Sequence, residues 1–226
     1  MSTATRKKPR AKTSRADRNE EVKRRLFSAA AKIVGRGGYE AASVARITAK
    51  AGVAQGTFYN HFGNRQELLD QLLPTIGRHM LDFIQKRVNG AVNEEEREVE
   101  RFQAFFDFLH EVPEFLRILN EAEFFAPTGH ARHFAVIVAG YLRILKRARA
   151  AGSLADFSDE ELEVVVHILL GARGYLSRRY AYVGNRVRPV PNHVVGAYEK
   201  LLARGLFAAT PRRRARRPLE MVTDDS

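Results

Sequence analysis

Apolar residues along this chain recur every three to four positions, the spacing that gathers side chains on one face of a helix. No segment alternates apolar and polar residues over a useful strand length. Capping residues, glycines and prolines divide the pattern into about nine helices. The sequence therefore predicts an all-α protein in which a small N-terminal domain of three helices precedes a larger helical domain.

The first three predicted helices follow one another closely. A helix over about residues 18–34 carries an apolar stripe and ends at the glycines that follow it. Ser43 is placed to cap a short helix over 44–51, and Gly52 can turn the chain sharply before a third helix over 54–62. Two short helices joined at a glycine are typical of a helix-turn-helix, a motif that binds DNA.

The helix-turn-helix residues divide between a buried and an exposed face. The apolar ones are spaced to pack against the first helix: Ile47, Val53, Phe58 and Phe62. The outward ones have side chains or backbone suited to DNA: Gln55, Gly56, Thr57, Tyr59 and His61. Glutamine pairs with adenine edges, a threonine methyl can meet a thymine methyl, and hydroxyl and imidazole groups donate to phosphates. Ser43 and Arg65 lie at helix N-termini, which attract phosphate. Alternatively, Tyr59 and His61 merely cover a surface helix.

The distribution of charge favours a polyanionic partner. Lys and Arg number 38 against 26 Asp and Glu, a net charge of +12. Residues 1–25 contain ten basic and three acidic residues, a net of +7. We expect residues 1–17 to be a disordered basic arm beside the DNA-binding domain, and residues 209–226 to be a second disordered tail. An anionic membrane also suits such a charge, and solubility alone is the simpler explanation of the tail.

The chain contains no cysteine, which excludes disulfides and thiolate metal sites. It has no apolar run long enough to cross a bilayer, and its N-terminus lacks the apolar segment of a secretory signal. An organellar transit peptide is conceivable for such a basic, Ser- and Thr-containing N-terminus. We expect instead a cytoplasmic protein with no membrane partner.

The remaining helices are predicted from caps and breakers. Capping-box spacing marks three helix starts, at Asn64 with Glu67, Asn93 with Glu96, and Ser158 with Glu161. Pro74 should kink or interrupt the fourth helix. Further helices are expected over about 113–120, 130–150, 158–182 and 189–207 or 192–207. The expected domains are residues 18–64 for DNA binding and 65–208 for effector binding and dimerisation.

Residues 20–72 resemble the N-terminal domain of the TetR family of bacterial repressors. The resemblance rests on LFSAAAKIVGRGGYEAAS, ITAKAGVAQGTFYNHF and NRQELL, with GTFYNHF as its most specific part. Thr48 stands where the family usually has Ala, and Arg65 where it usually has Lys. The resemblance implies that Gln55, Gly56 and Thr57 face bases in the major groove. It assigns the phosphates to Ser43, Tyr59, His61 and Arg65.

The same resemblance implies a homodimer built from the last two long helices and a ligand pocket whose occupation releases DNA. The two helices carry apolar and small residues: Leu162, Val165, Val166, Leu169, Leu170, Gly171, Ala172 and Gly174 on one, and Val194, Val195, Tyr198, Leu201 and Leu202 on the other. Both sets can instead belong to the core of one chain. Two DNA-binding motifs about 10 base pairs apart, or a multiple of that, would read a palindrome.

Phenylalanines are concentrated between Phe83 and Phe134, which suggests an apolar or aromatic pocket. The candidate pocket residues are His79, Phe83, Phe106, Phe124 and Tyr141, and the candidate ligands are a fatty acyl chain or a planar aromatic compound. Each Phe, taken singly, is more often a core residue than a ligand contact.

Other functions fit the sequence less well. Asp107 with His110 and His130 with His133 could each supply two metal ligands from one helix face, but nothing completes either set, so we expect no metal and no cofactor. A helical enzyme acting on an anion would need a nucleophile with its base or a phosphate loop, and neither is present, so no catalysis is expected. An architectural DNA-coating protein would bind with little sequence preference. The favoured hypothesis is a DNA-binding transcriptional regulator, a repressor released from a palindromic operator by a small apolar or aromatic ligand.

Overall fold

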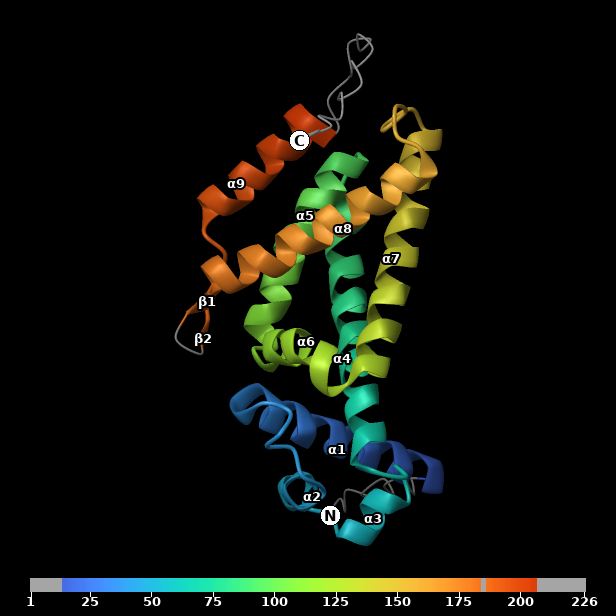
Figure 1. Cartoon of the computed structure of the whole chain (residues 1–226), viewed down its shortest axis with the longest axis vertical. Coiled ribbons are helices and arrows are strands. Elements are labelled where there is room, and N and C mark those ends of the chain that lie inside the picture. The colour runs from blue at the N-terminus through green and yellow to red at the C-terminus, as the bar shows by residue number, and fades with distance from the viewer. Residues whose placement is uncertain (1–13, 184–185, 207–226) are drawn as a thin grey trace, which may run out of the picture.

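The computed structural model describes residues 14–183 and 186–206, and within them the chain forms nine α-helices (Figure 1). Three of them make the N-terminal domain: α1 (Arg15–Gly37), α2 (Val44–Ala51) and α3 (Gln55–Tyr59). The C-terminal domain contains α4 (Arg65–Arg87), η1 (Val88–Gly90), α5 (Glu94–Glu111), α6 (Glu114–Phe125), α7 (Pro127–Ala150), α8 (Asp159–Leu176), η2 (Ser177–Ala181), β1 (Tyr182–Val183), β2 (Arg186–Val187), α9 (Asn192–Leu201) and η3 (Leu202–Leu206). The predicted all-α, two-part architecture is confirmed.

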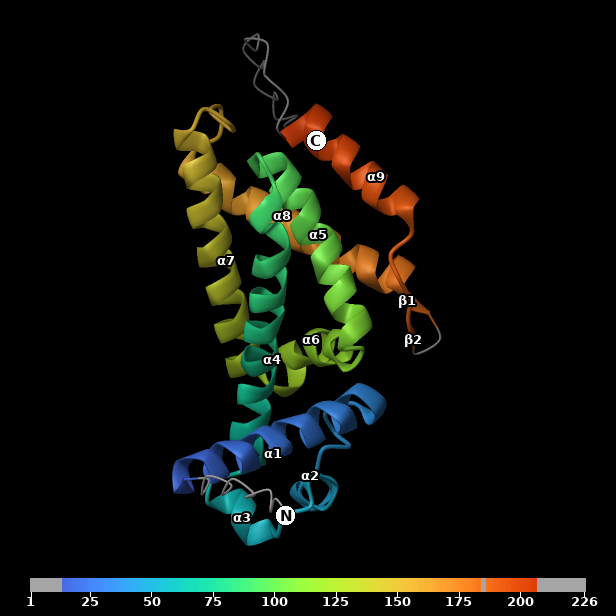
Figure 2. The same ribbon diagram turned by 180° about the vertical axis from the view of Figure 1, so that it is seen from behind.

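Helix α4 connects the two domains. It starts beside α1 and rises through the C-terminal domain between α5 and α7, while α8 runs obliquely across α5 and α4 (Figures 1 and 2). Its buried residues Leu68, Leu69 and Leu72 belong to one apolar core that extends from α1 to the end of α9. The N-terminal domain is therefore packed against the rest of the chain.

The predicted helix starts are confirmed by their hydrogen bonds. The side chains of Ser43, Asn64, Asn93 and Ser158 each accept from the backbone N–H three residues later. Ser158 and Glu161 form the complete reciprocal box. The sequence analysis missed a second complete box, Ser14 with Asp17, which starts α1 at Arg15.

Several boundaries differ from the predictions. Ser14 and residues 15–17, all expected in the basic arm, form the cap and first turn of α1, whereas residues 1–13 and the 209–226 tail lie outside the described residues. Helix α3 covers Gln55–Tyr59 and not all of 54–62. Tyr182 and Val183 pair with Val187 and Arg186 in a two-stranded antiparallel ladder, which is too short to leave an alternating pattern in the sequence.

Pro74 does not interrupt α4, which is one continuous helix. Proline removes the N–H that would bond to the carbonyl of Asp70, four residues earlier. Helix α7 comes close to α4 at this carbonyl, because a Cβ added to Gly129 would lie 2.3 Å from the Asp70 oxygen. The Gly129 N–H also donates to the Asp70 carboxylate at 3.1 Å. Helix α4 thus stays continuous through the proline while it packs against α5 and α7.

No helix in the described part of the chain is both long and apolar enough to cross a membrane.

The α4–α7 contact can be tested with two identical substitutions in α7. Gly129→Ala should lower the free energy of unfolding by about 1–3 kcal/mol, because the new methyl group meets the Asp70 backbone. Gly140→Ala, where an added Cβ has no neighbour within 4 Å, should raise it by about 0.5–1 kcal/mol through helix propensity. Urea unfolding measures both. Equal effects of the two changes would contradict the close approach.

Candidate nucleic-acid interface and ligand cavity

The turn between α2 and α3 is fixed by backbone geometry and by one arginine. Gly52 has φ 65° and ψ 43°, the left-handed conformation that glycine adopts without steric cost, and its N–H caps the end of α2. From α1, the Arg25 guanidinium donates to the carbonyls of Ala51 and Gly52. Gly52 therefore turns the chain between α2 and α3, and Arg25 attaches α1 to this turn.

The apolar side of the motif is buried as predicted. Ile47, Phe58 and Phe62 are almost fully buried, and Val53 is partly buried against the same core. The Phe62 ring packs edge-on against Phe27 of α1, with a centroid distance of 5.4 Å. This packing determines which residues of α3 face outward.

The expected DNA contacts do not all have the same exposure. Gln55 and Gly56 are exposed, and nothing lies within 4 Å of a Cβ added to Gly56. The Tyr59 side chain is 56% exposed. Thr57 and His61 are half-buried, and His61 lies in the turn beyond the end of α3. Ser43 is exposed, although its oxygen already accepts from the Arg46 N–H at 3.3 Å.

Arg65 makes contacts that the sequence did not indicate. Its Nε donates to the Ala42 carbonyl at 2.8 Å, and a terminal nitrogen donates to the Tyr39 carbonyl at 2.5 Å. The half-buried guanidinium thereby fixes the segment that precedes α2 to the start of α4. A phosphate contact by Arg65 stays a prediction, and its internal role comes from the structure.

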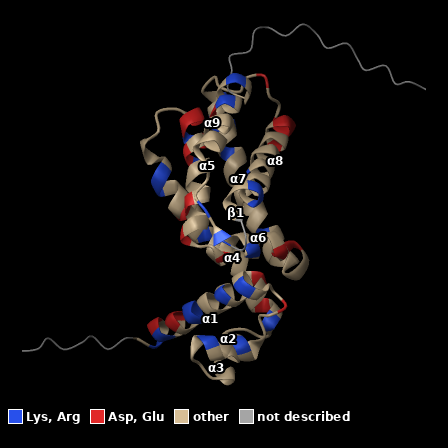
Figure 3. Cartoon of the chain, turned by 90° about the vertical axis from the view of Figure 1, so that its left-hand side faces the viewer, with Lys and Arg blue, Asp and Glu red and all other residues tan. Residues whose placement is uncertain are grey.

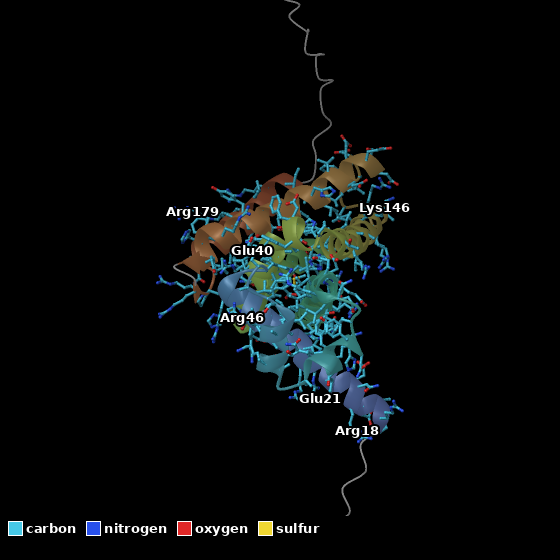
Figure 4. The ribbon with its side chains drawn as sticks, turned by 60° about the horizontal axis from the view of Figure 1, so that its bottom comes forward. Arg18, Glu21, Glu40, Arg46, Lys146 and Arg179 are labelled. Carbon is cyan, nitrogen blue, oxygen red and sulfur yellow. The ribbon has the colours of Figure 1, made fainter. Side chains whose placement is uncertain are left out.

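Two basic residues on α2 were missed by the sequence analysis. Arg46 and Lys50 are exposed, lie one helical turn apart, and form no ion pair within the described residues. Figure 3 shows basic and no acidic segments on α2, beside the exposed end of α3. The sequence did contain a signal for this exposed pair. Arg46 and Lys50 are four residues apart, which places them on one face of the helix, and this face is not the one that buries Ile47 and Ala51. Arg18, at the N-terminal end of α1, lies at the edge of the domain farthest from Lys146 and Arg179 in Figure 4.

A cavity of about 610 Å³ lies in the C-terminal domain between α4, α5, α6, α7 and α8. Such a volume suits a drug-sized ligand. Apolar side chains make much of its wall: Met80, Leu81, Ile84, Val88, Phe105, Leu119, Phe134, Val136, Ile137, Ile144 and Leu170.

The five residues predicted for a ligand pocket are not gathered in this cavity. Tyr141 lines it, but Phe106 is buried in the core one residue from the lining Phe105. Phe83 packs against Phe108 outside the cavity with the two rings tilted, and Phe124 is 80% exposed on α6. His79 lines a different groove, between α1 and α4. The prediction of one pocket containing all five was wrong, because helical phase and not residue type decides which side chains face the cavity.

One wall of the cavity contains a buried ionic network. The Glu98 carboxylate accepts from the guanidinium of Arg173, from Arg101 at 3.3 Å and from the Tyr198 hydroxyl at 2.8 Å. Arg101 and Arg173 both lie against the Tyr141 ring. Burial raises the pKa of Tyr141 and, more strongly, that of Tyr198, where the Glu98 charge adds to the effect. Both hydroxyls therefore stay protonated at neutral pH.

The two residue pairs considered as metal ligands, Asp107 with His110 and His130 with His133, do not lie in metal-binding surroundings in the part of the chain that the structure describes. His133 is buried in the cavity wall, and burial, followed by the nearby charge of His130, lowers its pKa to about 4. Asp107 forms an ion pair with Arg87 at 3.0 Å. Within the described residues no three His, Asp or Glu side chains gather where they could hold a metal ion.

Tyr39 joins the two domains beneath the cavity. Its hydroxyl donates to the Ile118 carbonyl at 3.2 Å, its N–H donates to the Glu121 carboxylate at 3.1 Å, and its ring stacks on Phe125. Arg117 adds a bond from α6 to the Arg36 carbonyl at 2.9 Å. The face of α6 that touches α1 is thus opposite the face that lines the cavity.

Most of the residues expected at the dimer interface make their contacts within this chain. Most of the apolar ones are buried within this chain: Leu162, Val165, Val166, Leu169, Val194, Val195, Tyr198 and Leu202. For these residues the alternative, core interpretation was correct. A different stripe of α8 is exposed, formed by Val164, Ile168, Gly171 and Tyr175, and Leu201 of α9 is 67% exposed.

The described residues thus combine a helix-turn-helix domain with a helical domain that contains a cavity, and comparisons with known proteins match parts of this arrangement. Residues 26–72 match the sequence profile of the bacterial regulatory proteins of the tetR family. The chain is 35% identical over 66 residues to YvdT, an HTH-type transcriptional regulator of Bacillus subtilis (strain 168). It is 32% identical over 81 residues to KstR2, an HTH-type transcriptional repressor of Mycobacterium tuberculosis (strain H37Rv).

The two alignments cover 29% and 36% of this chain, and 34% and 38% of the relatives. The chain thus matches little more than a third of the length of these relatives. Solved structures extend the likeness in fold. A TetR-family regulator from Syntrophomonas wolfei has a TM-score of 0.69 at 16% identity, covering 85% of this chain and all of that one. FadR from Bacillus subtilis, in complex with stearoyl-CoA, has a TM-score of 0.67 at 15% identity, covering 79% and 96%.

Residues 26–72 therefore match a TetR-family domain, and the described part of the chain has the fold of solved TetR-family regulators.

The two roles of Arg65 can be separated by substitution. Arg65→Ala should lower the free energy of unfolding by about 1.5–3 kcal/mol, because two carbonyls lose a charged donor. Urea unfolding in the absence of DNA measures this. Unchanged stability combined with weaker DNA binding would instead leave Arg65 with a phosphate role alone.

Proposed function

We propose that this chain is a homodimeric transcriptional repressor that binds a palindromic DNA operator and is released by a small ligand with a large apolar part. The observation that carries the proposal is the exposure of α3, where Gln55, Gly56 and Tyr59 face solvent beside the cations of α2. The proposed place of action is the cytoplasm, and the proposal includes no catalytic step.

The proposed DNA contacts divide into two kinds. Gln55 and Gly56, with the half-buried Thr57, are assigned to base edges in the major groove, where glutamine recognises adenine. Ser43, Tyr59, His61, Arg46 and Lys50 are assigned to phosphates, which position the helix without reading sequence. Arg65 already donates from two of its nitrogens to the carbonyls of Ala42 and Tyr39, so a phosphate contact is assigned to its remaining N–H groups.

Dimerisation is supported by the exposed stripe of α8. Val164, Ile168 and Tyr175 are each about 60% exposed on one helical face, and an added Cβ at Gly171 meets nothing within 4 Å. Monomeric proteins rarely leave a continuous apolar helix face in water. We assign this face, with Leu201, to a twofold contact with a second copy, which would present two α3 helices to one duplex.

The position of α6 supports a way in which ligand binding could release DNA. Leu119, Asn120 and Glu123 line the cavity, whereas Ile118 and Glu121 hold Tyr39. A ligand that displaces α6 would move these two partners. Tyr39 in turn accepts from Arg65 at the start of α4, so the displacement would reach the DNA-binding domain. FadR of Bacillus subtilis was solved with stearoyl-CoA, and an acyl chain is our first candidate for the apolar part of the ligand here.

The direct test of the proposal is selection from a pool of random duplexes. We expect the selected sequences to be palindromic, with half-sites about 10 base pairs apart or a multiple of that spacing. A pool that stays random after selection would indicate an architectural DNA-binding protein instead.

Dodecanoate, dodecanoyl-CoA and planar aromatic compounds should then be titrated against the selected complex, and loss of fluorescence anisotropy would report release.

The two kinds of DNA contact should respond differently to substitution. Gln55→Ala should relax base preference at one position by about 1–3 kcal/mol. Arg46→Ala should weaken binding to all duplexes and lower the slope of log affinity against log salt by about one. Lys32 of α1 is also exposed but lines the groove that contains His79, so Lys32→Ala is the charge-matched control. Identical salt slopes for the Arg46 and Lys32 variants would remove Arg46 from the interface.

The proposed dimer surface can be tested with a charge. Ile168→Lys should convert the dimer to a monomer, because the interface would have to bury an unpaired ammonium group. Val92→Lys introduces the same group at an apolar residue that is also exposed but lies before α5, and should leave the dimer intact. Sedimentation equilibrium measures both. A dimeric Ile168→Lys variant would place the contact elsewhere.

A further inference from the structure

The cavity in the C-terminal domain is lined mostly by apolar side chains, and its charged lining residues are mostly cationic. Five arginines contribute to its wall: Arg101, Arg143, Arg147, Arg173 and Arg178. Glu123 is the single carboxylate in the same lining. The two lining histidines, His130 and His133, do not alter the sign, because an imidazole is either neutral or positively charged. A cavity with this balance attracts an anion into an apolar environment.

Only part of this positive charge is neutralised by the protein. Arg101 and Arg173 share the Glu98 carboxylate, and Arg101 also pairs with Glu94. For Arg143, Arg147 and Arg178 the described residues supply no ion-pair partner. The cavity therefore keeps an excess of positive charge after its internal ion pairs are counted.

Arg173 also has unused hydrogen-bonding capacity. Its side chain is 6% exposed, and its Nε has no hydrogen-bond partner within the described part of the chain. An unsatisfied donor in a buried guanidinium is costly and rare in native proteins. The same residue lines the cavity together with Tyr141, whose hydroxyl remains protonated and can donate.

We propose that the effector is an amphipathic anion, an apolar chain or ring system carrying a negatively charged group, and that Arg173 with Tyr141 and Arg101 binds this group. The inference rests on the proposed ligand-responsive function and specifies the chemistry of its ligand. The charged group supplies the acceptor that Arg173 Nε lacks, while the apolar part lies against Leu81, Ile84 and Phe105. The anion can be a free carboxylate at the end of the chain or the phosphates of an acyl-coenzyme A.

The primary experiment varies only the head group of the ligand. Dodecanoate, 1-dodecanol and dodecanoyl-coenzyme A, each below its critical micelle concentration, are titrated into the full-length protein by calorimetry. At least one of the two anions should bind about tenfold or more tightly than the alcohol, the gain expected for one charge-assisted hydrogen bond. Tighter binding of the acid places the charge at the chain end, and tighter binding of the thioester places it on the phosphates.

Variants locate the anion within the cavity. Arg173→Met alone would leave the buried Glu98 with Arg101 as its one ion-pair partner among the described residues, so it is combined with Glu98→Gln, which removes both charges of the Glu98–Arg173 pair. The double variant should lose the preference for the anion and keep the affinity for 1-dodecanol, which shows that the cavity is intact. Glu98→Gln alone keeps the arginine, removes a competing carboxylate and should bind the anion at least as tightly as the unmodified protein.

The possible failures have different meanings. Equal affinity for acid, thioester and alcohol overturns the anion inference but leaves an apolar effector and the proposed function standing. A double variant that keeps its full preference for the anion overturns the role of Arg173. If none of the three ligands binds while a selected duplex does, the inference fails together with the acyl-ligand part of the proposed function, and DNA binding is unaffected. A protein that binds the ligands but no duplex would overturn the regulator proposal alone.

Discussion

The burial of Tyr39 between α1, α4 and α6 is the contact on which the arrangement of the two domains depends. Its side chain is completely buried, its hydroxyl and its N–H are each bonded to α6, and its carbonyl accepts from Arg65 of α4. Burial and the neighbouring Glu121 raise the pKa of this tyrosine, so the hydroxyl keeps its proton and its bond. Because three helices meet at one residue, α6 cannot shift without changing the support of the helix-turn-helix.

Local signals in the sequence predicted the elements well. A capping box requires only a hydroxyl or amide and a carboxyl three residues apart, and the caps at Ser43 and Ser158 formed as predicted. Gly52 was placed correctly because a left-handed cap is a property of one residue. The burial of Phe58 and Phe62 followed from their spacing.

The cavity could not be predicted in the same way, since it depends on the rotation of each helix against its neighbours. One residue step turns a side chain by about 100° around the helix axis. Met80 therefore lines the cavity while His79 lies in another groove. The Glu98–Arg173 pair joins residues 75 apart in sequence, and no local pattern connects them. From the sequence, Arg65 was likewise predicted to bind phosphate at a helix N-terminus. Its carbonyl partners, Ala42 and Tyr39, are more than 20 residues away and come close to it only when α1 and α4 pack together.

Helix α8 has one face buried against the rest of the chain and one face exposed to solvent. Leu169 and Arg173 face inward, and Arg173 belongs to the cavity wall, while Ile168 and Tyr175 face outward on the surface we assign to the second copy. Tyr198 ties α9 to the same wall through Glu98. In such a dimer, α8 would be braced from outside by its partner and from inside by the ionic network. A ligand entering the cavity would then meet a rigid wall on this side, and its displacement would be taken up by α6, whose opposite face is attached to Tyr39.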